Sequence, residues 1–161
     1  MTTRELTDIL NWRRLDAGTT LSGQPTEAQL AGIARLGVTH VVNLGPHTNE
    51  GALEDEAGTV AALGMTYVHI PVDFDGPTEA DFAAFCDAME RLSNERVHVH
   101  CLYNARVTAF IHRRARAGRG GSEAETRALM DGVWRPGGVW ATFVGDDDAV
   151  DLPNRYAGED Y

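Results

Sequence analysis

The chain has 161 residues, of which 24 are acidic, 14 are basic and 43% are hydrophobic, so its formal net charge is −10. This size suits one domain with a packed core, and the negative charge excludes nucleic acid as an expected partner because the phosphate backbone would be repelled. No segment is apolar over the length that spans a bilayer, and the charged N-terminus lacks the apolar run of a signal peptide, so we expect a cytoplasmic protein.

Two cysteines and the absence of lysine complete the composition. Two cysteines are too few for a disulfide framework and fit a reducing compartment, where a single thiol can carry out chemistry. All 14 basic residues are arginines. Codon bias is one interpretation of this usage. Adaptation to high salt is the alternative, which the acidic composition leaves open.

The first part of the chain predicts a strand, a helix and a second strand. A short strand covers 21–23, and Thr26 with Gln29 forms the capping box of a helix whose apolar residues recur at helical spacing. Residues 38–44 are apolar on both faces, which is typical of a central parallel strand.

The middle of the chain repeats this alternation. After a loop at 45–51, the pattern predicts a helix over about 52–63 and a strand over 65–72. A second loop, 73–77, leads to a helix that begins near Thr78.

The strand over 96–100 leads directly into Cys101, and the helix after this cysteine runs to about Gly118. A glycine-rich break follows, and Ser122 caps a further helix. The tail, 145–161, is acidic and poor in apolar residues, which predicts a solvated or frayed end.

Strands separated by helices imply right-handed βαβ crossovers and a parallel sheet covered on both faces. We therefore predict an α/β fold with three layers, αβα, around a mostly parallel central sheet of four to five strands. The chain, 1–161, forms one domain with its core at about 20–118, a helical C-terminal segment at 122–144 and the acidic tail at 145–161. Sites in such sheets lie at the carboxyl ends of the strands, so we expect three loops to meet there: 45–51, 73–77 and 101–106.

Cys101 is the best candidate for a catalytic residue. It lies between a buried strand and a helix, where loop N–H groups and the positive end of the helix dipole stabilise a thiolate or a bound oxyanion. Arg106 adds a planar guanidinium that can hold two oxygens of such an anion. The alternative is that Cys101 is a small buried apolar residue. We expect phosphate or sulfate to bind at this loop.

The other residues of this turn are predicted to bind substrate or to support the loop. Asn104 suits a position with positive φ. Thr108 either bonds to the Cys101 sulfur or bonds back to its own helix. His98 and His100 are expected to be structural, with His100 orienting the loop through its backbone, and no cluster with metal-ligand spacing is present, so we predict no metal. The predicted substrate-binding residues are His100, Leu102, Tyr103, Asn104, Ala105, Val107 and Thr108.

Transfer from a leaving oxygen needs a proton donor. Asp73 and Asp75 lie on the loop at the expected face and are both candidates, with Asp73 preferred, and turn formation is their alternative role. Cys86 lies on the apolar face of a predicted helix, so we expect it to pack in the core. A resolving thiol, which forms a disulfide with oxidised Cys101, is the alternative role for Cys86.

The turn HCLYNARVT, with the strand before it and IPVDFD upstream, resembles the dual-specificity branch of the cysteine-dependent protein tyrosine phosphatases. The chain is more similar still to the small bacterial phosphatase-like proteins of that superfamily. The resemblance covers about residues 20–115. Its motifs are LSGQPT, a DE-rich helix, GxxYxxIPV and HCxxNxR, at residues 21–26, 54–56, 64–72 and 100–106.

The resemblance implies a phosphatase-like fold and a mechanism. Cys101 would attack phosphorus to form a phosphocysteine, while Arg106 and the loop amides hold the equatorial oxygens. An aspartate would protonate the leaving group and then activate water, without a metal or other cofactor. The substrate would be a phosphorylated protein or a small phosphomonoester.

The sequence departs from the superfamily pattern in two places. The usual loop has five residues between cysteine and arginine, whereas four separate Cys101 from Arg106, and Val107 stands where the arginine is expected. One residue is a rotation of about 100° on a helix, so Arg106 keeps the usual bidentate contact only if the loop reshapes. The upstream acid aligns near Phe74, between two aspartates. Both departures lower the expected activity.

Three functions follow, in order of preference. The first is a cysteine-dependent phosphatase that hydrolyses phosphomonoesters, with low activity. The second is a catalytically impaired pseudophosphatase that binds phosphate, which the displaced Arg106 favours. The third is a rhodanese-like sulfurtransferase that carries a persulfide on Cys101, because rhodanese-type proteins often use a Cys-x4-Arg loop.

Overall fold

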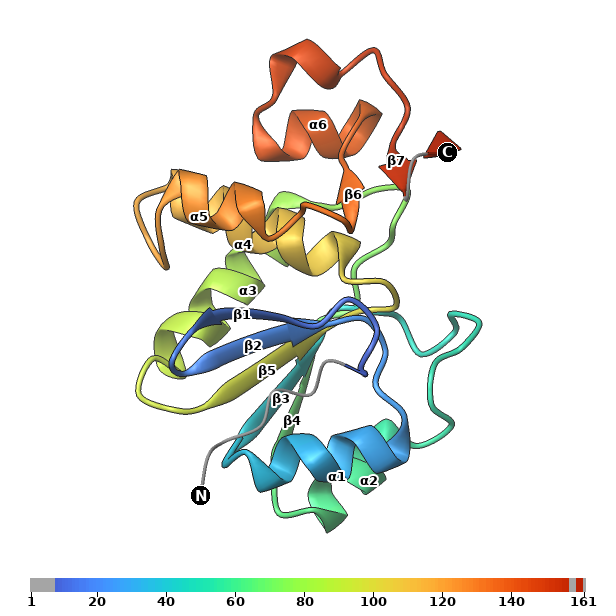
Figure 1. The fold of residues 1–161 in the computed structure, drawn as a ribbon, viewed down its shortest axis with the longest axis vertical. Coiled ribbons are helices and arrows are strands. Elements are labelled where there is room, and N and C mark those ends of the chain that lie inside the picture. Colours follow the sequence, from blue (N-terminus) through green and yellow to red (C-terminus); the bar gives the residue numbers. More distant parts are fainter. Residues whose placement is uncertain (1–7, 157–158, 161) are drawn as a thin grey trace.

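A five-stranded sheet forms the middle layer of the protein, within the residues that the computed structural model describes, 8–156 and 159–160 (Figure 1). β1 pairs antiparallel with β2, and the other neighbours are parallel. The prediction of a mostly parallel sheet of four to five strands is confirmed. In their order across the sheet, the strands are β1 (Arg13–Asp16), β2 (Thr19–Ser22), β5 (Val97–His100), β3 (His40–Asn43) and β4 (Thr66–His69).

Of the five strands in this sheet, the edge strand β1 is the one that the sequence analysis did not predict. Its residues alternate between half-buried and exposed positions, and it carries two arginines and an aspartate. The central strands β2 and β5, by contrast, are buried at every position. A short edge strand contributes few apolar residues to the core, so its sequence carries little of the pattern that identifies a strand.

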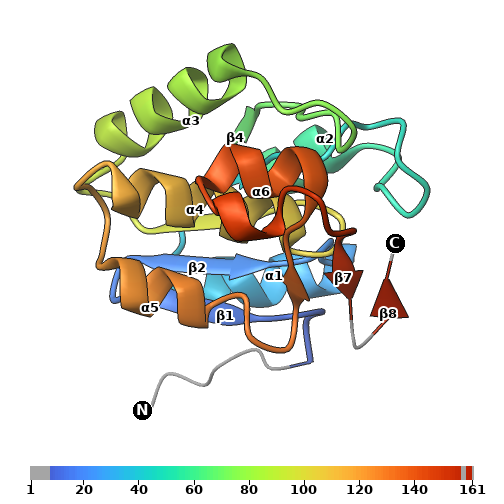
Figure 2. The same ribbon diagram turned by 90° about the horizontal axis from the view of Figure 1, so that it is seen from above.

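Helices cover both faces of the sheet, which gives the three layers predicted (Figure 1). One face carries α1 (Glu27–Arg35) and α2 (Glu56–Ala62), and the other carries α3 (Glu79–Arg91), α4 (Ala105–Arg116) and α5 (Glu123–Ala128). α6 (Gly138–Val144) packs over α4, as the view from above in Figure 2 shows. The predicted caps form, because the Thr26 and Ser122 hydroxyls both accept a backbone N–H of the first helical turn.

Two hydrophobic clusters lie on opposite faces of the sheet. The larger includes Val99 and Cys101 with residues of α3, α4 and α6, and the smaller includes Val41 with residues of α1 and α2. Because side chains alternate along a strand, His98 and His100 of β5 lie on the α1 and α2 face. The strand that ends at the nucleophile candidate therefore presents apolar groups to one layer and imidazoles to the other.

The C-terminal segment folds back onto the domain. Its remaining elements are β6 (Trp134–Arg135), η1 (Asp147–Ala149), β7 (Arg155–Tyr156) and β8 (Glu159–Asp160). β7 pairs antiparallel with both β6 and β8. This small sheet lies beside α6, as Figure 2 shows.

Residues 145–156 of the tail that was predicted to be solvated or frayed are mostly exposed, but they are not frayed, since they form η1 and β7; residues 157, 158 and 161 lie outside the described residues. Tyr156 stacks on Trp134 with ring centroids 5.5 Å apart, and Ala149 is buried. The segment has few apolar residues, and two of them, Ala149 and Tyr156, provide these contacts. The average composition of residues 145–156 therefore did not indicate that this segment packs against the domain.

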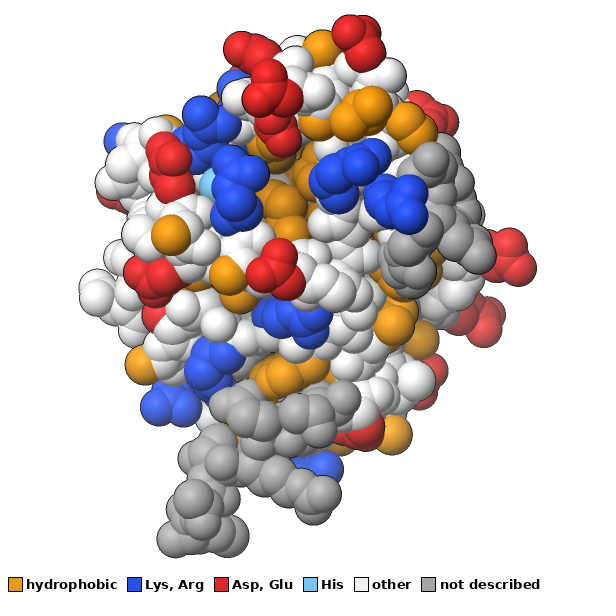
Figure 3. Space-filling view, turned by 45° about the horizontal axis from the view of Figure 1, so that its top comes forward, with side chains coloured by type: hydrophobic (Ala, Val, Ile, Leu, Met, Phe, Trp, Pro, Cys, Tyr) orange, Lys and Arg blue, Asp and Glu red, His pale blue; other side chains and the backbone are white. Residues whose placement is uncertain are grey.

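Charged side chains of both signs are interspersed over the face shown in Figure 3. Arginines of the C-terminal half of α4 and the turn after it lie beside carboxylates: Arg113 beside Glu79 at 2.6 Å, Arg116 beside Glu123 at 3.7 Å and Arg119 beside Glu90 at 3.5 Å. A neighbouring carboxylate therefore balances the charge of each of these three arginines. Among the described residues, no helix is long and apolar enough to cross a membrane.

Candidate active site

The turn between β5 and α4 carries the cysteine and the arginine that the sequence analysis singled out. Cys101 follows β5 directly, and α4 begins after Asn104, whose φ of 75° lies in the left-handed region. The predicted positive φ of Asn104 is confirmed, and asparagine adopts it more readily than most residues. The backbone N–H of Asn104 donates to the Cys101 sulfur at 3.2 Å. This hydrogen bond ties the sulfur to the N-terminal end of α4.

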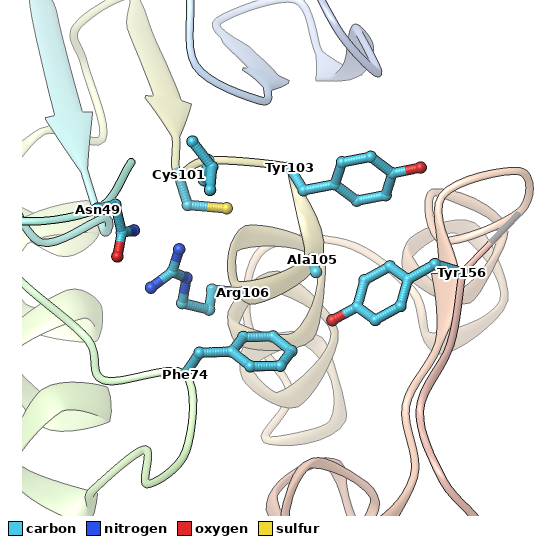
Figure 4. A pocket seen from close by; sticks show the side chains of 8 residues that line it. Asn49, Phe74, Cys101, Tyr103, Ala105, Arg106 and Tyr156 are labelled. Carbon is cyan, nitrogen blue, oxygen red and sulfur yellow. The ribbon is translucent and has the colours of Figure 1, made fainter. Parts of the chain in front are cut away.

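A cavity of about 450 Å³ opens over this turn (Figure 4). Cys101 is only 1% exposed, yet its sulfur points into this cavity. The three loops that were predicted to meet do so here, since each contributes at least one lining residue. The lining residues are Asn49, Phe74, Cys101, Leu102, Tyr103, Ala105, Arg106 and Tyr156.

Arg106 reaches the same cavity despite its early position in the loop. Arg106 is 5% exposed and lines the cavity together with Cys101, with its guanidinium on the side of Asn49 (Figure 4). Its Nη1 donates to the Val72 carbonyl oxygen at 2.9 Å, and its Cζ lies 5.7 Å from the centroid of the Phe74 ring. Val107 is fully buried in the larger hydrophobic cluster. In this turn, an arginine at position 106 faces the cavity, whereas position 107 belongs to the core.

Three aromatic side chains line the cavity: Phe74, Tyr103 and Tyr156. The rings of Tyr103 and Tyr156 meet edge to face with centroids 5.4 Å apart, and the Phe74 ring lies 6.3 Å from that of Tyr156. Of the described residues that line the cavity, Arg106 alone carries a basic side chain, and the Asn49 amide lies near it (Figure 4). Such a cavity suits a compact anion attached to an apolar or aromatic body.

Beneath the turn, on the α1 and α2 face, His100 forms a buried pair with Glu56. Nε2 of His100 lies 2.6 Å from Oε2 of Glu56, and the two side chains are 0% and 1% exposed. The other carboxylate oxygen accepts from Gln24 Nε2 at 2.7 Å. Burial raises the pKa of Glu56, but the hydrogen bonds and charge of its neighbours, led by His100, outweigh this and leave the pKa below its ordinary value of 4.5.

The two histidines of β5 have different surroundings. The Nδ1 atom of His100 lies 3.2 Å from the Cys101 carbonyl oxygen, which is the backbone contact predicted for it. His98 instead lies between the hydroxyls of Thr20 at 2.7 Å and Ser22 at 2.8 Å, and burial lowers its pKa well below 6.5. His98 is thus a neutral structural residue. Among the described residues, no three His, Cys, Asp or Glu side chains gather to hold a metal ion.

The two candidate proton donors, Asp73 and Asp75, do not line the cavity. Both are exposed, and Asp73 Oδ1 accepts the backbone N–H of Asp75 at 2.9 Å. Phe74, which lies between them, turns its ring into the cavity instead (Figure 4). The alternative role in turn formation is confirmed for Asp73. Proton transfer by either carboxyl stays a prediction.

Thr108 bonds to its own helix, which was one of its two predicted roles. Its hydroxyl donates to the Asn104 carbonyl oxygen at 2.9 Å and accepts from Trp134 Nε1 at 3.0 Å. Cys86 is half-buried on α3 as a free thiol, and burial raises its pKa more than the nearby arginines lower it. This fits the predicted packing role of Cys86, and its role as a resolving thiol stays a prediction.

Sequence reasoning missed four residues that the structure brings to the site, one of which is Phe74, noted in the sequence only as the position that aligns with the upstream acid. Glu56 begins α2 and pairs with His100, 44 residues away in the chain. Asn49 lies in a loop that was expected at the site, but no pattern marked this residue. Tyr156 was missed because its segment was interpreted as solvated. The acidic run at 54–56 was the one signal present, and it did not show which carboxylate is buried.

Comparison with solved structures gives close matches to this arrangement. A candidate phosphatase (DUF442) from Shewanella putrefaciens CN-32 is 30% identical, with 90% of this chain and 95% of that chain covered and a TM-score of 0.79. The core catalytic domain of the PP-IP phosphatase SIW14 from S. cerevisiae, in complex with citrate, is 15% identical over 92% of this chain and 98% of its own, with a TM-score of 0.68. TpbA from P. aeruginosa, in complex with pTyr, is 17% identical over 87% of this chain and 78% of its own, with a TM-score of 0.61. No protein-family model and no curated protein matches the chain.

Proposed function

Because the chain belongs to the DUF442 family of phosphatase-like proteins, with the fold of the cysteine-dependent protein tyrosine phosphatases, we propose that it hydrolyses phosphomonoesters through a phosphocysteine on Cys101. Its structural neighbours are phosphatases of this fold, which supports phosphatase function. One observation carries the proposal. The Cys101 sulfur and the Arg106 guanidinium face the same cavity, and the Asn104 N–H bonds to the sulfur.

In the proposed reaction, the Cys101 thiolate attacks phosphorus and the bond from phosphorus to the leaving oxygen breaks. The N–H groups of the turn and of the first turn of α4 stabilise the oxygens of the transferring group. The Nη1 of Arg106 donates a hydrogen bond to the Val72 carbonyl oxygen. The other N–H groups of the guanidinium are available to bind the anion. Water then attacks the phosphocysteine, which releases phosphate and restores the thiolate.

We propose Asp73 as the proton donor to the leaving oxygen, with Asp75 as the alternative. Both flank Phe74, whose ring occupies the cavity side of this loop, so a carboxyl reaches the leaving oxygen only when the loop rearranges. Turnover is therefore slow for leaving groups that need a proton and faster for aryl oxygens that leave as anions. The proposed substrates are phosphorylated proteins or small phosphomonoesters.

Hydrolysis of p-nitrophenyl phosphate tests the proposal. The wild-type protein is expected to release p-nitrophenol, and Cys101→Ser is expected to lose this activity. Cys86→Ser is the matched control, since this thiol lies on α3 and does not line the cavity. Wild-type protein that binds phosphate but releases no more product than Cys101→Ser would contradict hydrolysis and favour the pseudophosphatase.

Transfer of sulfane sulfur is a second candidate function. The Cys-x4-Arg spacing favours it, and so does the position of Asp73 and Asp75 outside the cavity, because sulfur transfer from thiosulfate has no leaving oxygen to protonate. The Cys101 thiolate would attack the outer sulfur of thiosulfate, forming a persulfide and releasing sulfite. Cyanide would take that sulfur as thiocyanate and restore the thiolate. Thiocyanate formation that Cys101→Ser abolishes would support this function.

A further inference from the structure

The buried pair under the nucleophile turn has no part in the mechanism above. We infer that Glu56 is a positioning residue: through His100 it orients the peptide bond between Cys101 and Leu102, so that the Leu102 N–H faces the anion in the cavity. Only the kinetic readout of this inference rests on the proposed function. The protonation of the ring and the binding of an anion can both be measured without turnover.

The contacts of His100 require both ring nitrogens to donate. Nε2 lies 2.6 Å from a Glu56 oxygen, and Nδ1 lies 3.2 Å from the Cys101 carbonyl oxygen. The carbonyl oxygen has no proton, and the Glu56 carboxyl is ionised at neutral pH because its pKa is lowered. A neutral imidazole carries one proton and would turn a lone pair toward one of these acceptors. His100 is therefore an imidazolium that the Glu56 carboxylate holds in place.

The contact with the Cys101 carbonyl decides where the next N–H points. In a trans peptide unit the C=O and the N–H point in opposite directions, and the described residues contain no cis peptide bond. Because the Cys101 carbonyl is turned toward His100, the Leu102 N–H is turned the other way, and Leu102 lines the cavity. Within the described part of the chain, this N–H donates to no protein acceptor.

The β2–α1 loop holds the next peptide unit of the turn, the one between Leu102 and Tyr103. The Gln24 N–H donates to the Leu102 carbonyl oxygen at 2.9 Å, while the Gln24 side chain donates to Glu56. A Cβ at Gly23 would lie 2.7 Å from the Leu102 carbonyl oxygen, so the two backbones are in close contact. Gln24 thus joins the Glu56 carboxylate and the nucleophile turn in one hydrogen-bonded network.

Stabilisation of the fold does not by itself explain this pair. Two buried charges lose their hydration, and well-packed apolar residues of similar volume often stabilise a fold as well or better. Among the residues that the structure describes, Glu56 is the one carboxylate that faces the ring, so without it an imidazolium at His100 would have no counter-ion. The polar groups next to the His100 ring are Glu56 on α2, the neutral His98 ring on β5, whose centroid is 6.2 Å away, and the backbone of the Cys101 turn. Gln24 and His47 act on the ring indirectly, because they lower the pKa of Glu56.

NMR of the ¹⁵N-labelled His100 ring tests the first step. We expect two protonated nitrogens at neutral pH in the wild-type protein and in Glu54→Gln, and one in Glu56→Gln. Glu54→Gln is the matched control, because it removes the same charge two residues earlier at an exposed position. The His100 signals are identified by their loss in His100→Gln. A singly protonated ring in the wild-type protein overturns the inference, whether or not Glu56→Gln folds.

Binding of orthovanadate tests the second step. We expect Glu56→Gln to bind it about 10- to 100-fold more weakly than Glu54→Gln, as for a displaced oxyanion donor. We expect kcat for p-nitrophenyl phosphate to be lower in Glu56→Gln than in Glu54→Gln by the same factor, with little change in KM. Glu56→Asp keeps the charge and should recover part of the lost kcat and affinity. Equal orthovanadate affinity in folded Glu56→Gln and Glu54→Gln overturns the inference. A wild-type protein without phosphatase activity overturns the proposed function and leaves the ring and binding measurements intact.

Discussion

The turn after β5 and the loop after β4 both lie at the carboxyl end of the sheet, but they are built differently. In the turn, Cys101 and Arg106 are buried, and the Cys101 sulfur and carbonyl both have partners. In the loop, the backbone is held by the Trp140 indole, which donates to the Phe74 carbonyl oxygen at 2.7 Å, while the carboxylates of residues 73 and 75 are exposed. The proposed anion site is part of the packed structure, whereas the carboxylates on the β4 loop are exposed.

This difference separates two requirements of the proposed chemistry. Donors for an oxyanion act best when they are in place before the substrate arrives, since their reorganisation would otherwise reduce the stabilisation. A proton donor must instead approach one particular leaving oxygen. The turn therefore suits both phosphoryl transfer and sulfur transfer, and the loop is the region that distinguishes them. The predictions below test the two regions in order of expected effect.

Removal of the nucleophile should have the largest effect and should leave the anion site in place. We expect Cys101→Ser to lower the rate of p-nitrophenyl phosphate hydrolysis by about 10⁴-fold or more, as for other nucleophiles that form covalent intermediates. Phosphate binding, measured by calorimetry, should persist, because the N–H groups and Arg106 remain. Loss of phosphate binding in a folded Cys101→Ser protein would contradict the separation of anion binding from chemistry.

Replacement of the guanidinium should have the next largest effect. We expect Arg106→Lys to lower kcat/KM by about 100-fold, because an ammonium cannot bond to the Val72 carbonyl and to two anion oxygens in the planar geometry of arginine. Arg119→Lys is the control, since its ion pair with Glu90 is exposed and contributes little. If both variants retain wild-type kinetics, Arg106 has no role in the reaction.

The loop should show a smaller effect that depends on the leaving group. We expect Asp73→Asn to lower kcat by about 10- to 100-fold for an alkyl phosphate and by less for p-nitrophenyl phosphate, because an aryl oxygen leaves more readily without a proton. Asp75→Asn should have the smaller effect of the two. A larger effect of Asp75→Asn would assign the role to Asp75. No effect of either substitution on the alkyl phosphate would exclude this loop as the proton donor.

Acid should weaken the fold through Glu56, and this effect should be the smallest. The pKa of Glu56 is lowered in the folded protein, so its contribution to stability is present above the unfolded value near 4.5 and is lost as the pH falls through the lower folded value. Urea unfolding from pH 6 downward should therefore show a stability difference between wild type and Glu56→Gln that shrinks in acid. A difference that grows in acid would mean that the pKa of Glu56 is raised.

Much of the fold could be predicted because its signals are local. The Thr26 capping box, the two-sided apolar run that became β3, and the strand–cysteine–helix order at Cys101 each lie within a few residues of sequence. The meeting of three loops followed from the rule that parallel strands end at one edge of the sheet. The conformation of Asn104 was also predictable, since few side chains tolerate its positive φ.

The sequence by itself determined the order of the elements, the αβα layers and the identity of the turn that holds Cys101, because periodicity, caps and turn residues act over short distances. The tertiary structure alone decided that Glu56 lies beneath His100, that Tyr156 forms a wall of the cavity, and that the exposed aspartates at 73 and 75 do not line it. Each of these facts depends on one side chain meeting another from a distant segment. No local pattern encodes such a contact, since it depends on the packing of the whole domain.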